Sequence, residues 1–383
     1  MRVMPVFGTR PEAIKLAPVI RTLEESSDFE VLPVVTGQHR QMLDQVLAVF
    51  RIHPVVDLDI MEAEQSLTHV TCAALSGLER VLRELRPDVV LVQGDTTTTF
   101  AAALAAFYQR IPVGHVEAGL RSGDLGNPFP EELNRRLTAV VTRWHFAPTR
   151  RARQRLLAEG VDPAQVWVTG NTVIDALWDV ARRTTFAPRG ELAHLTARGL
   201  RLLLVTTHRR ESWGEPHRRV YRALKELVRR FEDVAVVLSV HPNPAVRRVV
   251  EEELAGAERV VLLPPPDYGE FVGLLKACYL VLTDSGGIQE EAPALGRPVL
   301  VLREVTERPE GLEAGCARLV GTDPVRIVEE VGRLLSDPAA YQQMARARNP
   351  YGDGLAARRI EQVLRRAFGL PVGEPVVPAS FDG

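Results

Sequence analysis

The chain has few cysteines and no long apolar run, and each shortage excludes a class of protein. Its three cysteines, Cys72, Cys278 and Cys316, lack the spacing of metal ligands, which favours reduced structural thiols and a cytoplasmic location. No apolar stretch reaches the length of a membrane span, and the apolar residues before Gly8 are too few for the core of a signal peptide. We therefore expect no membrane partner.

The chain also lacks a charge excess and the common cofactor motifs. Lys and Arg number 47 against 49 Asp and Glu, for a net charge of −2, so there is no basic excess to neutralise a nucleic acid. No G-x-G-x-x-G follows an apolar run, no G-x-x-x-x-G-K-[ST] occurs, and the histidines lack zinc spacing such as H-E-x-x-H. We expect no nucleic acid partner, and neither a nicotinamide nor a metal cofactor.

What is present is an alternation of short apolar runs with helical patterns. This alternation is typical of βαβ units with parallel sheets, and 383 residues are too many for one ordinary core. Strands are expected at residues 2–7, 30–35, 88–93, 112–116, 144–147 and 166–168, and then at 202–206, 235–240, 259–262, 279–282, 298–302 and 318–320. The sequence predicts an α/β protein of two Rossmann-like domains, whose parallel sheets face a central ligand-binding cleft.

A break in the alternation indicates the domain boundary. Pro188, Gly190 and Gly199 interrupt the pattern between residues 186 and 201, and we place the junction in or just before this segment. Residues 1–170 are assigned to an N-terminal domain and 171–354 to a C-terminal domain. The helical stretch 355–368 is expected to pack back on the first domain, and residues 369–383 to form a flexible tail.

The stretch Thr-Asp-Ser-Gly-Gly-Ile-Gln-Glu-Glu follows an apolar strand and opens a helix. Ser285, Gly286 and Gly287 place backbone N–H groups and the positive end of a helix dipole at one point, which is typical of a phosphate site. About one turn further on, Glu291 is within reach of the vicinal hydroxyls of a ribose. The alternative is that Asp284 and Ser285 form an ordinary helix N-cap.

The stretch Phe-Gly-Thr-Arg-Pro-Glu-Ala-Ile-Lys follows the first predicted strand. Its Arg10 and Lys15 can both present positive charge to the cleft. Lys15 is the only lysine in the first 224 residues of a chain that otherwise uses arginine, which favours a role for a compact point charge. Chance is the alternative explanation.

Three acidic residues, Asp95, Glu117 and Glu131, follow predicted strands or begin a helix. Proton transfer at carbon needs one group to take a proton and another to donate one on the opposite face, and converging carboxylates suit this. As alternatives, Asp95 can cap the threonine-rich helix after it, and Glu131 can favour a helix N-terminus. No helix start accounts for Glu117, so the three as a set favour proton transfer.

The second domain places positive groups after its strands. His208, Arg209 and Arg210 follow the first of these strands, and such a cluster suits a diphosphate leaving group because charge-assisted hydrogen bonds strengthen as negative charge grows. His241 ends the next strand, and Arg308 lies beyond the glycine turn. A surface role is the alternative for either of the first two arginines taken singly.

Together these motifs resemble one family, the bacterial non-hydrolysing UDP-N-acetylglucosamine 2-epimerases. The matching segments are residues 7–15, 93–98, 114–121, 170–176, 208–211, 283–293 and 307–310. The resemblance implies the glycosyltransferase B fold and a homodimer. It also implies reversible interconversion of UDP-N-acetylglucosamine and UDP-N-acetylmannosamine, by elimination of UDP to a 2-acetamidoglucal and its re-addition, for cell-surface polysaccharide precursors.

The resemblance implies a role for each matched residue. For catalysis it implies Asp95, Glu117, Glu131 and His208. For binding of UDP-N-acetylglucosamine and UDP it implies Arg10, Lys15, Phe271, Ser285, Gly286, Gly287, Glu291 and Arg308. For a second, activating UDP-N-acetylglucosamine it implies Gln38, His39, Gln41, Gln65, Arg209 and His241. Two positions depart from the pattern: Glu64 stands where some regulated relatives carry arginine, which leaves activation open, and Pro266 replaces a glutamine near the uracil.

Three other functions are compatible with a UDP-sugar site. They are a glycosyltransferase of the same fold, a hydrolysing epimerase that releases N-acetylmannosamine and UDP, and a sensor that binds without turnover. The acid-rich first domain favours the epimerase, because a transferase needs an acceptor groove instead.

Overall fold

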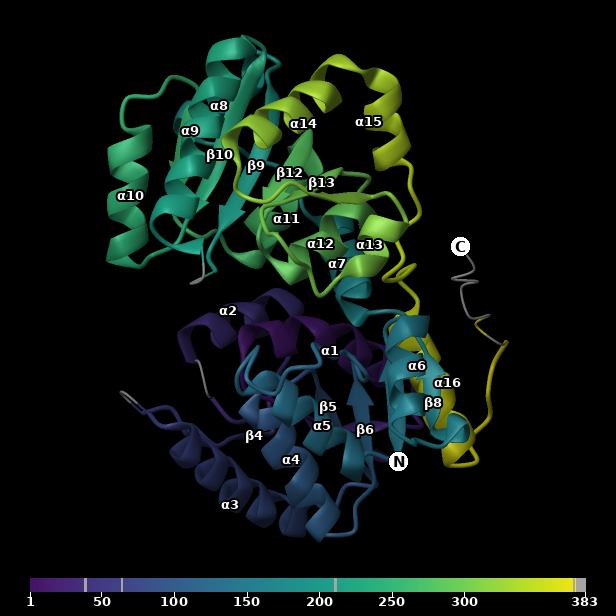
Figure 1. Ribbon diagram of the computed structural model, residues 1–383. Helices are drawn as coiled ribbons and strands as arrows, with labels where there is room; N and C mark the ends of the chain where they lie inside the picture. The colour runs from purple at the N-terminus through teal and green to yellow at the C-terminus, as the bar shows by residue number, and fades with distance from the viewer. Residues whose placement is uncertain (38–39, 63–64, 210–211, 375, 377–383) are drawn as a thin grey trace. The chain divides into compact units, whose positions relative to one another are not determined.

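The computed structural model describes residues 1–37, 40–62, 65–209, 212–374 and 376 (Figure 1). The chain forms two compact units: unit 1 comprises Met1–Ala176 and Tyr351–Gly383, and unit 2 comprises Leu177–Pro350. The sequence placed the boundaries after residues 170 and 354. In the structure the chain leaves unit 1 inside helix α7 (Thr172–Arg183) and returns ahead of helix α16 (Ala356–Ala367).

Unit 1 is built on an 8-stranded parallel sheet with the order β4-β3-β1-β5-β6-β7-β8, in which β2 pairs with β1. Its strands are β1 (Arg2–Phe7), β2 (Glu30–Val31), β3 (Val34–Val35), β4 (Val56–Asp57), β5 (Val89–Gln93), β6 (Val113–Val116), β7 (Trp144–Ala147) and β8 (Val166–Val168). Its helices, besides α7 and α16, are α1 (Arg10–Glu24), α2 (Arg40–Phe50), α3 (Leu67–Leu85), α4 (Thr97–Tyr108), α5 (Glu131–Val141), α6 (Arg150–Ala158) and a 3-10 helix at Pro163–Gln165.

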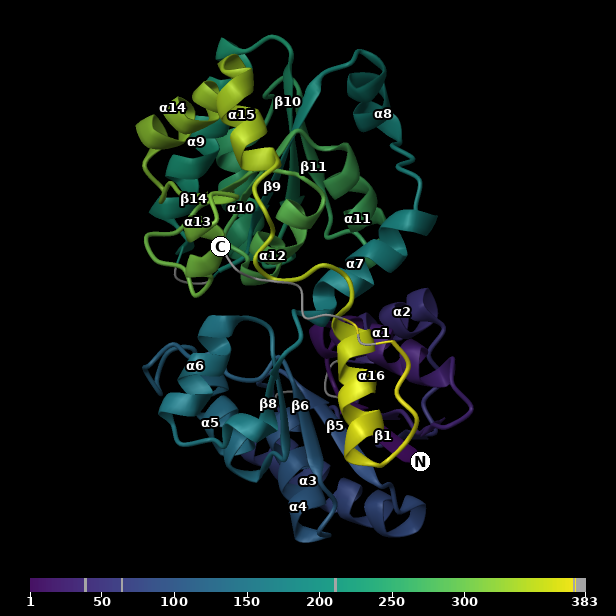
Figure 2. The ribbon, with the colours of Figure 1, turned by 90° about the vertical axis from the view of Figure 1, so that its right-hand side faces the viewer.

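The segment that returns from unit 2 is bound to unit 1 by charged side chains. The carboxylate of Asp175 accepts the N–H groups of Ala356 (3.2 Å) and Ala357 (2.9 Å) at the start of α16, and burial raises the pKa of Asp175 to about 6. Arg359 donates to the carbonyl oxygen of Thr169 at 2.9 Å, and Asp353 of the same segment pairs with Arg359 at 2.7 Å. Helix α16 then packs beside α1, as Figure 2 shows.

The predicted flexible tail, residues 369–383, lies partly outside the described residues. Within the described part, the side-chain amide of Gln362 donates to the carbonyl oxygen of Glu374 at 2.7 Å.

Unit 2 is built on a 6-stranded parallel sheet with the order β11-β10-β9-β12-β13-β14, the order of a doubly wound Rossmann sheet. Its strands are β9 (Arg201–Thr207), β10 (Val234–Val240), β11 (Val260–Leu263), β12 (Leu280–Thr283), β13 (Val299–Val301) and β14 (Ala317–Leu319). Its helices are α8 (Gly190–Ala197), α9 (Glu215–Arg230), α10 (Pro244–Leu254), α11 (Tyr268–Ala277), α12 (Gly286–Ala294), α13 (Pro309–Glu313), α14 (Pro324–Ser336) and α15 (Pro338–Ala345).

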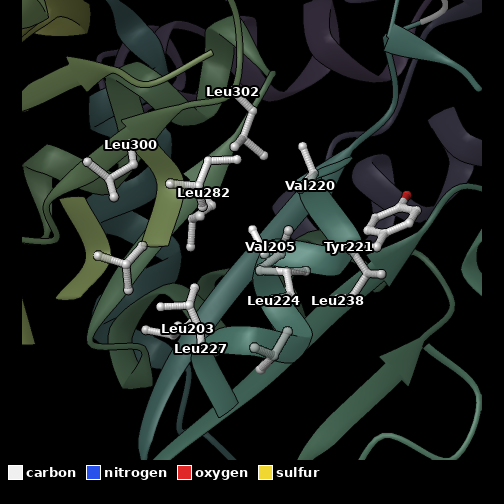
Figure 3. Packing of buried hydrophobic residues seen from close by; sticks show 14 of the residues in the cluster. Leu203, Val205, Val220, Tyr221, Leu224, Leu227, Leu238, Leu282, Leu300 and Leu302 are labelled. Atoms are coloured by element: carbon white, nitrogen blue, oxygen red, sulfur yellow. The ribbon is translucent and has the colours of Figure 1, made fainter. Parts of the chain in front are cut away.

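The core of unit 2 lies between the sheet and helices α9, α10 and α14. Leu203 and Val205 of β9 are fully buried and pack with Leu224 and Leu227 of α9 (Figure 3). Consecutive residues of β9 are buried on both faces, as expected for the central strand of a parallel sheet covered by helices on each side.

The strands lie where the alternation predicted them, which confirms the fold class of two parallel-sheet α/β domains. Residues 30–35 form two short strands rather than one, and β4 was missed because two residues are too few to show an alternation. The segment 186–201, predicted to be an irregular junction, contains helix α8. Its Leu192 and Leu195 are buried, so an apolar face stabilises this helix despite the nearby proline and glycines.

A glycine substitution tests the packing of helix α6 under the turn after β6. Gly119 has a φ of 89°, and a Cβ atom there would lie 2.3 Å from the carbonyl oxygen of Ala152 in α6. We expect Gly119→Ala to lower the free energy of unfolding by about 3 kcal/mol or more, because left-handed strain adds to a backbone clash. Urea unfolding of both proteins measures the difference.

Gly160 supplies the matched control. Its φ is 88°, but nothing lies within 4 Å of the position of its Cβ atom. We expect Gly160→Ala to lower the free energy of unfolding by only about 1–2 kcal/mol, the strain of a non-glycine residue in left-handed backbone. Equal losses for the two variants would contradict the close approach of α6 to Gly119.

Candidate functional site

Each sheet contains one point where the order of its strands reverses. In unit 1 the reversal lies between β1 and β5, and in unit 2 between β9 and β12. In open parallel sheets the loops on the two sides of such a reversal diverge at the carboxyl ends of the strands, and ligands bind there. The predicted catalytic and phosphate-binding residues follow β1, β5, β6, β9 and β12 or begin the helices after them.

A buried carboxylate, Glu12, connects the two loops at the reversal of unit 1. Its Oε2 accepts the backbone N–H groups of Gly8 (3.1 Å) and Thr9 (2.8 Å) after β1. Its Oε1 accepts the hydroxyls of Thr96 (2.7 Å) and Thr99 (3.1 Å) after β5. Burial raises the pKa of Glu12, although these hydrogen bonds oppose the shift. Sequence reasoning did not assign Glu12 a role.

Glu117 directly follows β6 and is buried, in left-handed backbone with a φ of 66°. Nζ of Lys15 lies 2.6 Å from its Oε1, to which the amide of Asn171 also donates at 2.9 Å, and the amide of Gln93 donates to its Oε2. Lys15 and Glu117, predicted independently, therefore form one ion pair. A non-glycine residue held in this backbone region by its surroundings is a feature of functional sites.

Asp95 is held by helix α5 rather than acting as a helix cap. The N-cap of α4 is Thr96, whose hydroxyl accepts the N–H of Thr99 at 3.1 Å, so the capping interpretation of Asp95 is wrong. Oδ2 of Asp95 lies 2.9 Å from Nε and 2.7 Å from Nη2 of Arg135. The amide of Asn134 donates to the carbonyl oxygen of Asp95 at 3.0 Å. The carboxylate is therefore oriented by its partners and only partly buried.

Glu131 and Glu132 begin helix α5 and have different surroundings. The buried carboxylate of Glu132 accepts the N–H groups of Ser122 (2.9 Å) and Gly123 (3.3 Å). Oε2 of Glu131 is also buried, but it has no hydrogen-bond partner within the described ranges. A buried carboxylate oxygen without a partner is uncommon and fits a group that binds a ligand or water. The position of Glu131 in the first turn also suits the helix dipole.

Arg10 begins helix α1 beside the reversal of unit 1. Its side chain is partly buried, and it makes no hydrogen bond or ion pair with another residue in the described part of the chain. Arg10 therefore adds a positive charge that is available to a ligand.

The glycine turn of unit 2 lies between two arginines. Ser285 is the N-cap residue of α12, but its side chain makes no capping hydrogen bond. The position of a Cβ atom on Gly286 would lie 3.9 Å from Nη2 of Arg308 and 4.0 Å from Nη2 of Arg209. Two guanidinium groups and the N–H groups of a helix N-terminus thus surround the same point, which favours a bound anion.

Glu291 lies buried in the second turn of α12, next to the glycine turn. The hydroxyl of Tyr268, at the start of α11, donates to its Oε1 at 2.8 Å. Its Oε2 would lie 3.8 Å from a Cβ atom on Gly287. Phe271 is buried one turn after Tyr268 in α11. Sequence reasoning missed Tyr268, because nothing in the local pattern of α11 distinguishes this tyrosine from a core residue.

Two further residues of α12 hold the loop that carries Arg308. Nε of Arg308 donates to Oε1 of Glu290, and both side chains are buried. The hydroxyl of Thr306 donates to Gln289 at 2.6 Å, and the Gln289 amide donates to the carbonyl oxygen of Ser285 at 3.1 Å. Glu290 and Gln289 were not predicted as site residues, and their place beside Glu291 is the only signal for them in the sequence.

His208 follows β9 and Asp284 follows β12, so these residues lie on the two sides of the reversal in unit 2. Nδ1 of His208 lies 2.8 Å from Oδ1 of Asp284, and Oδ2 accepts the N–H groups of His208 (2.9 Å) and Arg209 (3.0 Å). Burial raises the pKa of Asp284, but these groups outweigh burial and leave the pKa below its ordinary value. The carboxylate of Asp284 binds the backbone of the His208 loop instead of the first turn of α12, so the interpretation of Asp284 as a helix cap is wrong.

The residues predicted to bind an activator are only partly described. Gln38, His39 and the side chain of Gln41 lie outside the described residues, as does Glu64.

The remaining members of that set lie in both units. In unit 1, Oε1 of Gln65 accepts the N–H of Glu62 at 3.2 Å. In unit 2, Arg209 flanks the glycine turn, and Nδ1 of His241 accepts the N–H of Asn243 at 3.2 Å.

Neither a metal cluster nor a membrane helix is found in the described ranges. No three His, Cys, Asp or Glu side chains there could hold a metal ion. No described helix is both long and apolar enough to cross a membrane.

Comparison with known proteins gives the family. A family model described as UDP-N-acetylglucosamine 2-epimerase matches residues 21–365. The chain is 54% identical over 370 residues to the UDP-N-acetylglucosamine 2-epimerase of Yersinia pestis, covering 95% of this chain and 98% of that protein. It matches a putative UDP-N-acetylglucosamine 2-epimerase from Listeria monocytogenes with a TM-score of 0.90 and 48% identity, over 98% of both chains.

A third similar protein was solved with a ligand. The UDP-N-acetylglucosamine 2-epimerase of Neisseria meningitidis, bound to UDP-N-acetylglucosamine, has a TM-score of 0.87 and 45% identity, over 96% of this chain and all of that one. With its two parallel-sheet units and near-complete coverage by these relatives, the chain belongs to the UDP-N-acetylglucosamine 2-epimerase family.

Proposed function

We propose that this protein catalyses the reversible epimerisation at C2 of UDP-N-acetylglucosamine to UDP-N-acetylmannosamine. The observation that carries the proposal is a division of chemistry between the two sheet reversals. Carboxylates gather beside the reversal of unit 1, and a glycine turn flanked by two arginines, with a carboxylate about one helical turn away, lies at the reversal of unit 2. The related Neisseria meningitidis protein binds UDP-N-acetylglucosamine, which supports the same substrate here.

The proposed reaction is an anti elimination followed by re-addition. A base takes the proton from C2, the electron pair of that bond forms the C1–C2 double bond of a 2-acetamidoglucal, and the C1–O bond breaks as UDP leaves. In the return step an acid donates a proton to C2 from the opposite face, and UDP forms the C1–O bond again. The overall reaction changes no oxidation state, so it requires no redox cofactor.

Three carboxylates of unit 1 are the candidates for these proton transfers. Arg135 pairs with Asp95 and orients it, and Lys15 does the same for Glu117. Glu131 has a buried carboxylate oxygen, Oε2, that accepts no hydrogen bond from any described residue. The reaction needs an acid and a base on opposite faces of C2, and three carboxylates held in different ways can supply both.

Unit 2 supplies the proposed nucleotide site. The diphosphate binds at Ser285, Gly286 and Gly287, between the guanidinium groups of Arg308 and Arg209. Glu291, held by Tyr268, accepts hydrogen bonds from the ribose hydroxyls, and Phe271 contacts the uracil side. Arg10 and Lys15 of unit 1 bind the phosphates or the sugar, and His208 assists the diphosphate as UDP leaves.

The cellular setting and regulation form part of the same proposal. We place the enzyme in the cytoplasm, where the free thiols of Cys72, Cys278 and Cys316 stay reduced, and assign its product to cell-surface polysaccharide precursors. A second UDP-N-acetylglucosamine as activator involves Gln65, Arg209 and His241 among the residues that the structure describes.

Incubation with UDP-N-acetylglucosamine in D2O without an acceptor tests the reaction. We expect deuterium at C2 and appearance of the manno epimer, because the proton removed at C2 is replaced from a group that exchanges with solvent. Proton NMR and mass spectrometry of the recovered nucleotide sugars measure both.

The other outcomes separate the competing functions. Free N-acetylmannosamine with an equal amount of UDP would indicate a hydrolysing epimerase. Unlabelled and unchanged substrate would exclude an epimerase and leave a transferase or a sensor.

Paired substitutions test the division of labour between the units. We expect Asp95→Asn to lower kcat by about 10²-fold or more with UDP affinity nearly unchanged, as for loss of an acid or base. We expect Glu291→Ala to weaken UDP binding by about tenfold, because charge-assisted hydrogen bonds to the ribose are lost. Steady-state kinetics and titration calorimetry with UDP measure the two effects.

Asp233→Asn is the matched control. Asp233 also pairs with an arginine, Arg201 at 2.7 Å, but near the amino end of β9, away from the reversal. We expect wild-type kcat and UDP affinity for this variant. Wild-type turnover in Asp95→Asn would reduce Asp95 to a structural partner of Arg135, and unchanged UDP affinity in Glu291→Ala would remove the ribose assignment.

The proposal also includes a homodimer, supported by an exposed apolar face of unit 1. Leu133, Leu137 and Val140 form a stripe along α5, and Val140 is 82% exposed. Phe107 and Tyr108 are exposed at the end of the neighbouring helix α4. Exposed apolar side chains on two neighbouring helices favour an interface. In a two-fold dimer the same apolar face of both partners would meet, as in an isologous interface.

A charge substitution on this face tests the dimer. We expect Val140→Asp to convert the protein to a monomer, because a carboxylate buried without a partner is strongly unfavourable. Light scattering after size-exclusion chromatography measures the mass. Val325 of α14 is also a highly exposed valine on a helix, and Val325→Asp should leave the mass unchanged. A wild-type monomer, or a Val140→Asp dimer, would contradict the assignment.

A further inference from the structure

We propose that Asp284 is a positioning residue, which holds the imidazole of His208 with Nδ1–H toward its own carboxylate and so presents Nε2 to the diphosphate of the nucleotide sugar. This inference rests on the proposed function, in which His208 assists the departure of UDP. It adds a residue whose carboxylate, rather than capping α12, sets the orientation of a catalytic side chain.

Both carboxylate oxygens of Asp284 lie against the His208 loop. Oδ1 is buried, Nδ1 of His208 lies 2.8 Å from it as an ion-pair contact, and no described residue donates an aligned hydrogen bond to it. Oδ2 accepts the backbone N–H groups of His208 and Arg209 at 2.9 and 3.0 Å. The carboxylate of Asp284 thus holds the backbone of His208 through Oδ2 and lies against Nδ1 of the imidazole through Oδ1. A carboxylate that accepts Nδ1–H leaves Nε2 as the nitrogen for the ligand.

The position of Asp284 in the sheet makes these contacts rigid. Asp284 follows β12, its N–H donates to the carbonyl oxygen of Thr206 in β9, and His208 follows β9. The carboxylate therefore spans the two strands that flank the reversal, next to the glycine turn of Ser285 and Gly286. Movement of His208 relative to that turn would break hydrogen bonds to a buried charge.

Two other ionisable side chains near Asp284, those of His217 and Tyr221, are too buried to reach a ligand. His217 of α9 is 1% exposed, and burial lowers its pKa, which favours the neutral imidazole. Burial raises the pKa of Tyr221 to about 12, and its hydroxyl lies 2.9 Å from the hydroxyl of Thr207. By contrast, the side chain of His208 is 45% exposed. Asp284 can therefore affect a ligand through the side chain of His208, which contacts its carboxylate and is exposed.

The orientation matters because of where charge develops. When the C1–O bond breaks, negative charge grows on the diphosphate oxygen that leaves, and a preoriented hydrogen-bond donor stabilises this charge without reorganisation. An imidazole without such a contact would sample several orientations on its loop. A ring held by Asp284 loses no rotational entropy when the substrate binds, because its orientation is already fixed.

The test combines a double-mutant cycle with spectroscopy on the full-length protein. We expect Asp284→Asn and His208→Ala each to lower kcat by about 10²-fold. If Asp284 acts through His208, the double variant should be no slower than His208→Ala alone, because the interaction is already lost. Independent roles would multiply the two losses to about 10⁴-fold, and that result would overturn the proposal.

Ring-¹⁵N histidine NMR reports the tautomer directly. We expect Nδ1 of His208 to be protonated in the wild type, with its signals assigned by their loss in His208→Ala. Asp284→Asn should shift these signals toward the Nε2–H tautomer. An unprotonated Nδ1 in the wild-type protein would overturn the proposal, whether or not the variant folds.

A control separates positioning from loss of stability. The hydroxyl of Tyr341, a mostly buried side chain, donates to the carbonyl oxygen of Tyr279 at 2.8 Å, near the amino end of β12. Tyr341→Phe removes a hydrogen bond in the same unit and should leave kcat and the His208 signals unchanged. Absence of any epimerisation by the wild type would remove the proposed function, while the NMR result would still decide the role of Asp284.

Discussion

The structure depends on one buried carboxylate at the strand reversal of each sheet. Glu12 binds the loops after β1 and β5, and Asp284 binds the loops after β9 and β12. At a reversal the flanking loops leave in opposite directions, so neither can satisfy the other's polar groups through the sheet ladder. A buried carboxylate is costly unless it accepts several hydrogen bonds, and here it receives them only when both loops are in place. The same requirement therefore fixes the loops beside the strand reversal in each unit.

The charged side chains near the two reversals are also held by partners. Glu117 is paired with Lys15, Asp95 with Arg135, and Arg308 with Glu290. Buried and partly buried ion pairs contribute little net stability, because desolvation offsets much of the attraction, but removal of one partner is strongly unfavourable. Their main effect is to hold each candidate side chain in one orientation. In unit 1 this orients the acids, and in unit 2 it orients the groups that favour an anion, so that little reorganisation is needed when a substrate binds.

Local sequence patterns predicted much of this arrangement. The strands, the glycine turn at Ser285 to Gly287 and the acids after β5 and β6 are local features, and each lies where the pattern indicated. The roles of single polar residues were harder to predict. Asp95 and Asp284 both precede helices, and the local pattern allowed a cap in each case, yet their carboxylates bind Arg135 and the His208 loop. Their actual partners are 40 and 76 positions away in the chain. The capping alternatives failed because a capping preference is a local quantity and these partners are not local.

The sequence by itself determined the order of strands and helices, the two-unit organisation and the types of residue that follow each strand. It could do so because hydrophobic periodicity, turn residues and helix starts act over a few positions. Only the tertiary structure decided which strands are neighbours, and hence that Glu12 meets Thr96, that Tyr268 meets Glu291 and that Asp284 meets His208. The first and last of those contacts depend on pairing between β1 and β5 and between β9 and β12, strands separated by long stretches of chain. Hydrogen bonds across such distances follow from the packing of the whole sheet, which no local pattern specifies.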